Sequence, residues 1–242
     1  IDHIKSFPTD NLPVGIAGII KDFKPEEYGM DKPFIRKQDL FTQYGVAAAY
    51  QAMKQSGLSS QGENKNIDPF RLGVYFGSGI GGFATQYREI SKMIEDPSGQ
   101  WISPLFIPTM ISNIAAGHIA ILNNAQGPCL DIVTACATST NAMGEAFRAI
   151  RNGYADAIIT GGCENATIPI GIVGFANAKA LSRATDPNYA SLPFNGNRAG
   201  FVMADGSAAL VLEEYEHAKA RGAQILGEMV GYGNTCDAYH ST

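Results

Sequence analysis

The sequence predicts an α/β fold in which helices flank a mostly parallel sheet. Apolar runs of strand length occur at residues 71–77, 130–134 and 155–160, and each run ends at glycines or other small residues. Helix-like stretches follow the first two of these runs. Strands that alternate with helices in this way build a parallel sheet covered by helices.

The first part of the chain opens with a strand and a helix. Residues 14–23 are predicted to form a short strand, and residues 38–57 a helix that ends at a glycine. After a polar loop over residues 59–69, the run RLGVYFG at 71–77 has the composition of a buried strand. A cluster of glycines and a helix through Met93 follow it.

The second part of the chain repeats the alternation of strand and helix. Its predicted strands are residues 130–134, 155–160, 206–212 and 225–232. Its predicted helices are residues 139–152 and the stretch EEYEHAKARG, which follows the strand at 206–212.

The composition excludes several classes of protein. Of the 242 residues, 45% are hydrophobic and 17% charged, which is typical of one compact globular domain or a large piece of one. The formal net charge is −5 and Lys and Arg form no run, which argues against nucleic acid binding. The four cysteines form no CxxC pair and have no histidine at ligand spacing, so we expect no metal and no disulfide. Reduced thiols fit a cytoplasmic protein, and no signal peptide or transmembrane helix is predicted.

The segment DIVTACATSTNAMG at residues 131–144 is the strongest indication of chemistry. An apolar strand ends there in a turn of small residues, Cys136 lies at the corner, and a helix follows at once. Ala135 and Ala137 permit a sharp turn, and the positive end of the helix dipole favours a thiolate. Cys136 is therefore predicted to be a nucleophile, whereas Cys129, Cys163 and Cys236 lie in or beside strand-like runs and are predicted to be structural. The alternative is that Cys136 is a small buried residue.

Three motifs resemble one family of enzymes. TACATSTNAMG, GGCENATIPIGIVGFANAKALS and GFVMADGSAALVLEEYEHAKARGA are similar to the elongating β-ketoacyl-acyl-carrier-protein synthases of type II fatty acid synthesis, especially the synthase II group. The resemblance implies a thiolase-like layered fold of two similar halves, and a homodimer. Residues 1–242 would be a single partial domain, the N-terminal half, with the family's first strand and C-terminal half missing.

The resemblance also implies the reaction. An acyl group passes from acyl carrier protein, where it is held by the phosphopantetheine arm, to Cys136, and malonyl-carrier protein then condenses with it after decarboxylation. No further cofactor is implied. Two histidines and a lysine of the family's second half assist decarboxylation, and none of the histidines of this chain matches their motifs, so this chain alone is expected to be inactive in condensation. These histidines are His3, His118, His217 and His240, of which His118 is predicted to be a packed structural residue.

The resemblance assigns substrate-binding roles to three further residues. Ile80 in GSGIGG and Phe175 in IVGFANA match positions that line the acyl tunnel, and Thr242 in DAYHST matches a position that contacts the phosphopantetheine arm. The partner subunit would bring residues 109–111 to the same tunnel. The alternative for Ile80 and Phe175 is an ordinary place in the core.

Some positions depart from the family pattern or have a second reading. PFN at 193–195 replaces PFD, and Arg-Ala-Gly at 198–200 replaces Arg-Asp-Gly, which puts local hydrogen bonding in doubt. Lys32, Arg36 and Lys37 are candidates to attract an acidic carrier protein, or they form a solvated helix face.

Three other readings of the chain remain. GSGIGG at 77–82 satisfies the GxGxxG pattern of a dinucleotide-binding domain, although residues 97–108 beyond the next helix are loop-like. A chain-length-factor-like partner shares the predicted fold but replaces the nucleophile, and Cys136 argues against it. A truncated gene product, or a part of a longer synthase, would explain the length.

Overall fold

The computed structural model describes residues 1–239, and the chain divides into two compact units. The first unit consists of residues 1–44, 80–111 and 163–207, and the second of residues 45–79, 112–162 and 208 onward. In chain order the helices are α1 Lys32–Lys37, α2 Leu40–Ser56, α3 Phe83–Glu95, α4 Phe106–Met110, α5 Ile114–Leu122, α6 Thr138–Arg151, α7 Pro169–Asn177 and α8 Tyr215–Ala220.

A four-stranded sheet is the centre of the second unit. Its order is β4-β3-β5-β6, with β3 Leu72–Gly77, β4 Cys129–Leu130, β5 Ala157–Glu164 and β6 Gly206–Glu213. β3 pairs in parallel with both β4 and β5, and Gly77 of β3 stands opposite Gly162 of β5. All six residues of β3 are buried, which explains its unbroken apolar run.

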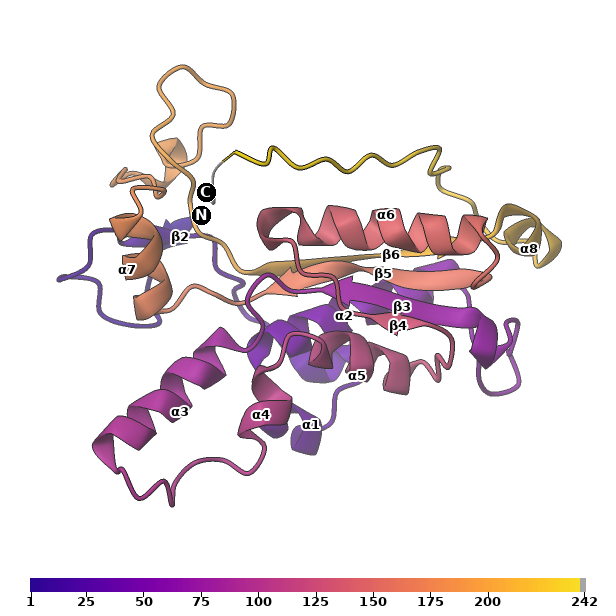
Figure 1. The fold of residues 1–242 in the computed structure, drawn as a ribbon, viewed down its shortest axis with the longest axis horizontal. Coiled ribbons are helices and arrows are strands. Elements are labelled where there is room, and N and C mark those ends of the chain that lie inside the picture. The colour runs from indigo at the N-terminus through magenta and orange to yellow at the C-terminus, as the bar shows by residue number, and fades with distance from the viewer. Residues whose placement is uncertain (240–242) are drawn as a thin grey trace. The chain divides into compact units, whose positions relative to one another are not determined.

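Helices cover both faces of this sheet. Figure 1 shows α6 on one face and α5 on the other, and both helices contact β3. Small residues of α6 pack on Tyr75 and Ile158 of the sheet, with Leu212 of β6 at the edge of the cluster. The predicted α/β arrangement with flanking helices is therefore confirmed.

The first unit has a smaller framework. β1 (Asp2–His3) pairs antiparallel with β2 (Ile16–Ala17), and Gly18 forms a further bridge to Ala204. Its core joins these segments to α7 through eight buried residues: Ile4, Val14, Ala17, Ala166, Ile172, Ala176, Leu181 and Met203. Within residues 1–239, no helix has the length and apolar character to cross a membrane.

Most elements predicted from the sequence are present, but two predicted strands are much shorter in the structure and a third does not form. The strand expected at 14–23 is reduced to β2, and the strand expected at 130–134 is reduced to β4. The latter ends because the chain turns over the end of β3, where the Ile132 carbonyl oxygen occupies the space of a Gly77 Cβ.

The strand expected at 225–232 does not form. Residues 222–239 have no assigned helix or strand. Two of their apolar side chains, Leu226 and Val230, are 72% and 83% exposed. The segment runs beside α6 (Figure 1). An apolar sequence favours a strand only where a neighbouring strand supplies hydrogen bonds, and the described chain supplies none here.

Candidate active site at the Cys136 turn

The corner predicted at Cys136 is a single 3₁₀ turn. The turn covers Ala135–Ala137, and α6 begins at the next residue. Ala135 has φ +50°, in the left-handed region that costs a residue with a side chain about 1–2 kcal/mol. This unfavourable conformation turns the chain sharply enough to place the thiol between strand and helix.

Hydrogen bonds from the start of α6 hold the turn. The Thr134 N–H donates to Thr138 Oγ1 at 2.9 Å, and Asn141 Nδ2 donates to Thr134 Oγ1 at 2.7 Å. The Ala137 N–H also donates to the Thr134 carbonyl at 3.1 Å. Thr134 is therefore bonded through its amide, its hydroxyl and its carbonyl, one residue before the strained position.

Two glycines leave room for the turn at the ends of the neighbouring strands. A Cβ on Gly77 would lie 2.1 Å from the Ile132 carbonyl oxygen and 2.4 Å from Thr138 Cγ2. A Cβ on Gly162 would lie 2.3 Å from Ser139 Oγ. The chain before Cys136 and the first turn of α6 can pack this closely on the sheet only because β3 and β5 carry glycine there.

The thiol at this turn is accessible. Cys136 is exposed, so the reading of it as a small buried residue is wrong. Its backbone N–H has no hydrogen-bond partner among residues 1–239. An accessible thiol, an unused N–H and the first turn of a 14-residue helix lie together here, an arrangement that suits attack on a carbonyl group.

Exposure alone does not distinguish Cys136 from the other cysteines. Cys163 is buried in β5, but Cys129 in β4 and Cys236 are exposed. The prediction that all three are structural residues is therefore unsupported for Cys129 and Cys236. The strained turn before a helix remains the feature that only Cys136 has.

Asp131 is a neighbour of the turn that sequence reasoning missed. Its Oδ2 accepts a hydrogen bond of 2.5 Å from Ser112 Oγ, while its Oδ1 is buried without a partner in the described chain. Burial raises the pKa of this carboxyl, although hydrogen bonds from Ser112 and the Ser78 backbone oppose the change. The available signal was a carboxyl inside the mostly apolar run that was predicted to form a strand at 130–134.

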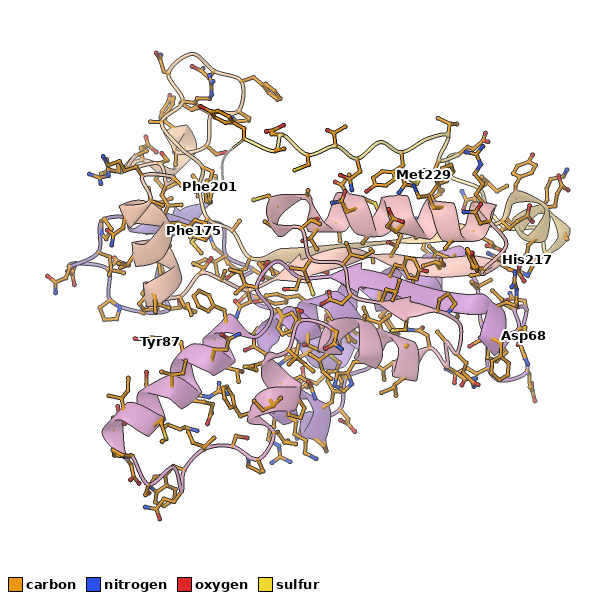
Figure 2. The ribbon with its side chains drawn as sticks, viewed as in Figure 1. Asp68, Tyr87, Phe175, Phe201, His217 and Met229 are labelled. Carbon is orange, nitrogen blue, oxygen red and sulfur yellow. The ribbon has the colours of Figure 1, made fainter. Side chains whose placement is uncertain are left out.

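The predicted tunnel residues lie in the first unit, whereas Cys136 lies in the second. Ile80 and Phe175 are about one-third exposed, at 36% and 37%. Phe175 packs edge-to-face against Phe201 with 5.5 Å between ring centroids, and Figure 2 shows the two rings together. Their role in a tunnel stays a prediction. Thr242 lies outside the described residues.

The basic residues of α1 stand beside a cavity of the first unit. Lys32, Arg36 and Lys37 are all exposed, and the last two line a cavity of about 290 Å³. Arg88 lines it as well and forms an ion pair with Glu89 at 3.0 Å. Thr109, predicted to reach a partner subunit, is buried here and donates to the Lys37 carbonyl at 3.0 Å.

Glu89 is a buried acid that supports this region. It is 1% exposed and binds Lys92 at 2.8 Å and the Ser103 N–H at 3.0 Å. Burial raises the pKa of Glu89, but the bonds from Lys92, Ser103 and Arg88 outweigh burial and lower it to about 2. The carboxylate is therefore charged and structural.

The glycine-rich segment 77–82 does not offer a phosphate site. The Gly82 N–H, at the start of α3, donates to the Met110 carbonyl at 2.9 Å, and a Cβ on Gly82 would meet the Met110 backbone at 2.7 Å. A dinucleotide-binding turn needs this amide and this space for a pyrophosphate. Among residues 1–239, no cluster of three or more His, Cys, Asp or Glu side chains could hold a metal ion.

Comparisons with known proteins point to one family. The profile described as "Beta-ketoacyl synthase, N-terminal domain" matches residues 5–218. A curated relative from Vibrio cholerae, named 3-oxoacyl-(acyl-carrier-protein) synthase 2, is 46% identical over 243 residues, which cover all of this chain and 57% of the relative.

Solved structures give the same answer. A β-ketoacyl synthase from Burkholderia phymatum matches with a TM-score of 0.83 at 30% identity, over 96% of this chain and 56% of the other. A type II PKS acyl-carrier protein in complex with its ketosynthase, bound to the hexaketide, matches with a TM-score of 0.82 at 28% identity, over 96% and 55%. The chain thus spans little more than half the length of the proteins it matches.

Proposed function

The chain belongs to the β-ketoacyl synthase family through its N-terminal domain, and on that premise we propose that it carries the nucleophile of a 3-oxoacyl-acyl-carrier-protein synthase of type II fatty acid synthesis. The fold is that of the ketosynthases, the predicted thiolase-like α/β architecture. The observation that carries the proposal is the accessible Cys136 at a strained turn before α6. A chain-length-factor-like role, which has no nucleophile, is disfavoured by the same residue.

The first half-reaction is a thioester exchange. The thiolate sulfur of Cys136 attacks the carbonyl carbon of an acyl group on acyl carrier protein, and the carbonyl oxygen becomes an oxyanion. The unused N–H of Cys136 donates to this oxyanion. When the carbonyl reforms, the phosphopantetheine thiolate leaves with the electron pair of the broken C–S bond, and the acyl group stays on Cys136. No cofactor takes part.

The second half-reaction is assigned to the complete enzyme. Malonyl-carrier protein loses CO₂, and the resulting carbanion attacks the carbonyl carbon of the acyl-Cys136 thioester. The C–S bond to Cys136 then breaks, the Cys136 thiolate leaves with its electron pair, and the acyl chain, now two carbons longer, stays on the carrier protein. We assign no base for this step within this chain, because none of its histidines matches the family's histidine motifs. His217 pairs with Glu213 at 2.6 Å, and burial in α5 lowers the pKa of His118. Residues 1–242 are in this proposal the N-terminal half of a homodimeric, cytoplasmic synthase.

The exposed basic residues of α1 are the proposed docking site for the acyl carrier protein. Lys32, Arg36 and Lys37 lie on one short helix, and no ion pair of these side chains occurs in the described structure. Unpaired cations attract an acidic partner at a distance. A solved relative that matches this chain holds an acyl-carrier protein, which supports the choice of partner.

The acyl pocket is proposed on the family match alone. Ile80 and Phe175 would line it, residues 109–111 of the partner subunit would close it, and Thr242 would contact the phosphopantetheine arm. Aromatic and aliphatic side chains suit a hydrocarbon chain, and both named side chains are partly accessible.

The test is acylation by an acyl-carrier-protein thioester. We expect the intact mass to increase by one acyl group and the modification to lie on the peptide that contains Cys136. Cys136→Ala should abolish the adduct, and Cys236→Ala, which removes another exposed thiol, should not. Equal acylation of Cys129, Cys136 and Cys236 would refute a specific nucleophile.

A further inference from the structure

Tyr232 is anchored in a segment that is otherwise exposed. It belongs to residues 222–239, which lie beside α6, and Figure 2 labels Met229 of the same segment next to that helix. A Cβ on Gly144 would lie 2.3 Å from three atoms of the Tyr232 ring, so the ring fills the place that the glycine leaves open. The Arg148 guanidinium lies 4.9 Å from the centre of this ring.

The hydroxyl of Tyr232 begins a chain of hydrogen bonds that leads to the active-site turn. It donates to Asn141 Oδ1 at 2.7 Å, and Asn141 Nδ2 donates to Thr134 Oγ1 at 2.7 Å. Asn141 is only 9% exposed, so water does not readily replace these partners. An amide has one oxygen and one NH₂ group, and a donor that holds the oxygen necessarily aims the NH₂ group.

The chain of bonds ends one residue before the strained position. Thr134 precedes Ala135, whose φ is +50°, and Ala135 precedes Cys136. A residue with a side chain stays in this conformation only where the surrounding structure determines it. The bond from Asn141 is one of the contacts that do so, and its direction depends on Tyr232.

We propose that Tyr232 and Asn141 are positioning residues for acyl transfer, which hold the Cys136 N–H where the oxyanion of the tetrahedral intermediate forms. This inference rests on the proposed function of Cys136. Neither residue touches the reacting atoms in this account, because both act through Thr134. The extended segment 222–239 thereby becomes a part of the active-site support and not a passive connection.

We call the hydrogen-bonded series Tyr232–Asn141–Thr134 the relay. Its removal should affect acyl transfer and the access of reagents to the Cys136 thiol differently. Acyl transfer needs the backbone N–H and the sulfur of Cys136 at fixed positions relative to each other, whereas alkylation by iodoacetamide needs only an accessible sulfur. In Tyr232→Phe the ring keeps its place on Gly144 and only the hydroxyl is lost. Loss of one neutral hydrogen bond predicts a fall in kcat of about 3- to 10-fold, with KM for the acyl donor and the alkylation rate changed less than about 2-fold.

The experiment compares four variants of the full chain with the wild type. Tyr232→Phe and Thr134→Val remove the two ends of the relay, and Thr134→Ser keeps the hydroxyl that accepts from Asn141. Tyr189→Phe is the matched control, because Tyr189 is 69% exposed and lies in the first unit. The measurements are acyl transfer, iodoacetamide alkylation, and amide hydrogen exchange of the peptide that covers residues 133–138.

We expect Tyr232→Phe and Thr134→Val to lower kcat and to raise exchange in this peptide, and Thr134→Ser and Tyr189→Phe to resemble the wild type. Unchanged exchange and unchanged kcat in Tyr232→Phe would overturn the relay. So would a lower melting temperature with normal kcat, since that result describes a merely structural contact. If exchange responds but the wild type is not acylated at Cys136, the proposed function fails while the relay to the turn stands.

Discussion

The substitution Gly77→Ala tests whether the close approach of the Cys136 turn to the sheet matters for catalysis. The added Cβ would lie 2.1 Å from the Ile132 carbonyl oxygen and 2.4 Å from Thr138 Cγ2, each at least 1 Å short of the 3.4 Å at which ordinary contact begins. The nearer obstacle is a backbone atom, so no side-chain rotation relieves it. Both ends of the turn must move away from β3.

The magnitude follows from this geometry. Overpacking of a core costs about 1–3 kcal/mol, and a backbone obstacle places Gly77→Ala at the upper end, about 3 kcal/mol. A displacement of about 1 Å at a reacting group lowers the rate on the order of 100-fold. Gly162→Ala should cost less, about 1 kcal/mol, because its nearest obstacle is the Ser139 hydroxyl, which can rotate.

The assay combines urea unfolding, followed by circular dichroism, with the rate of acylation under conditions where every variant is folded. Gly117→Ala is the matched control, because nothing lies within 4 Å of its added Cβ and it stands inside α5. Alanine there should stabilise the protein by up to about 1 kcal/mol and leave acylation unchanged. If Gly77→Ala is destabilised but acylates at the wild-type rate when folded, the glycine serves packing alone and the reasoning about the turn is wrong.

Three other predictions concern charge and backbone conformation. Glu89→Gln should lower the free energy of unfolding by about 3 kcal/mol at pH 7, since the pKa of Glu89 falls from 4.5 to about 2 on folding. This stability is present above pH 4.5 and is lost as the pH falls through about 2. If the free energy of unfolding of Glu89→Gln differs from that of the wild type by the same amount at pH 7 and at pH 2.5, the prediction is wrong. Asp131→Asn should stabilise the protein by about 1 kcal/mol at pH 7, because burial raises the pKa of that carboxyl and disfavours its charged form. Stability from Asp131 is present below the unfolded pKa of 3.8 and is lost as the pH rises through the folded value, so the gain should shrink in melting curves recorded below pH 4. Ala135→Gly should be more stable than Ala137→Gly by about 1–2 kcal/mol in urea, because only Ala135, at φ +50°, gains from the loss of its Cβ. Equal stabilities of these two variants would show that Ala135 is not strained.

The sequence was sufficient to predict the helices and strands that depend only on residues close together in the chain. The buried run at 71–77 became β3, and the helices predicted at 38–57 and 139–152 became α2 and α6 with small changes at their ends. The corner at Cys136 was predicted because small residues, a cysteine and a helix start occur within a few positions. Each of these patterns is local, so periodicity and turn chemistry reveal it.

Features that depend on distant partners were not predictable in the same way. The strand expected at 225–232 needed a neighbouring strand, and the bond from Tyr232 to Asn141 joins residues 91 positions apart. Glu89 follows Arg88 in α3, and a charged residue in such a helix is usually solvated, yet Glu89 is 1% exposed because Lys92 and Ser103 close around it. Spacing along a chain carries no information on such pairings.

A nucleophile at an exposed turn meets two opposed requirements. In the proposed reaction the sulfur of Cys136 must be open to a bulky acyl carrier. Residues 133–137 are exposed, so burial of their own side chains cannot fix their conformation. The conformation must nevertheless be exact enough to hold an N–H against a developing charge. The fixation therefore comes from outside the turn: from Gly77 and Gly162, which allow the approach of the sheet, and from Asn141, which holds Thr134. It follows that substitutions which never touch substrate should impair acyl transfer more than they impair access to the thiol, and that a screen based on thiol labelling alone would miss them.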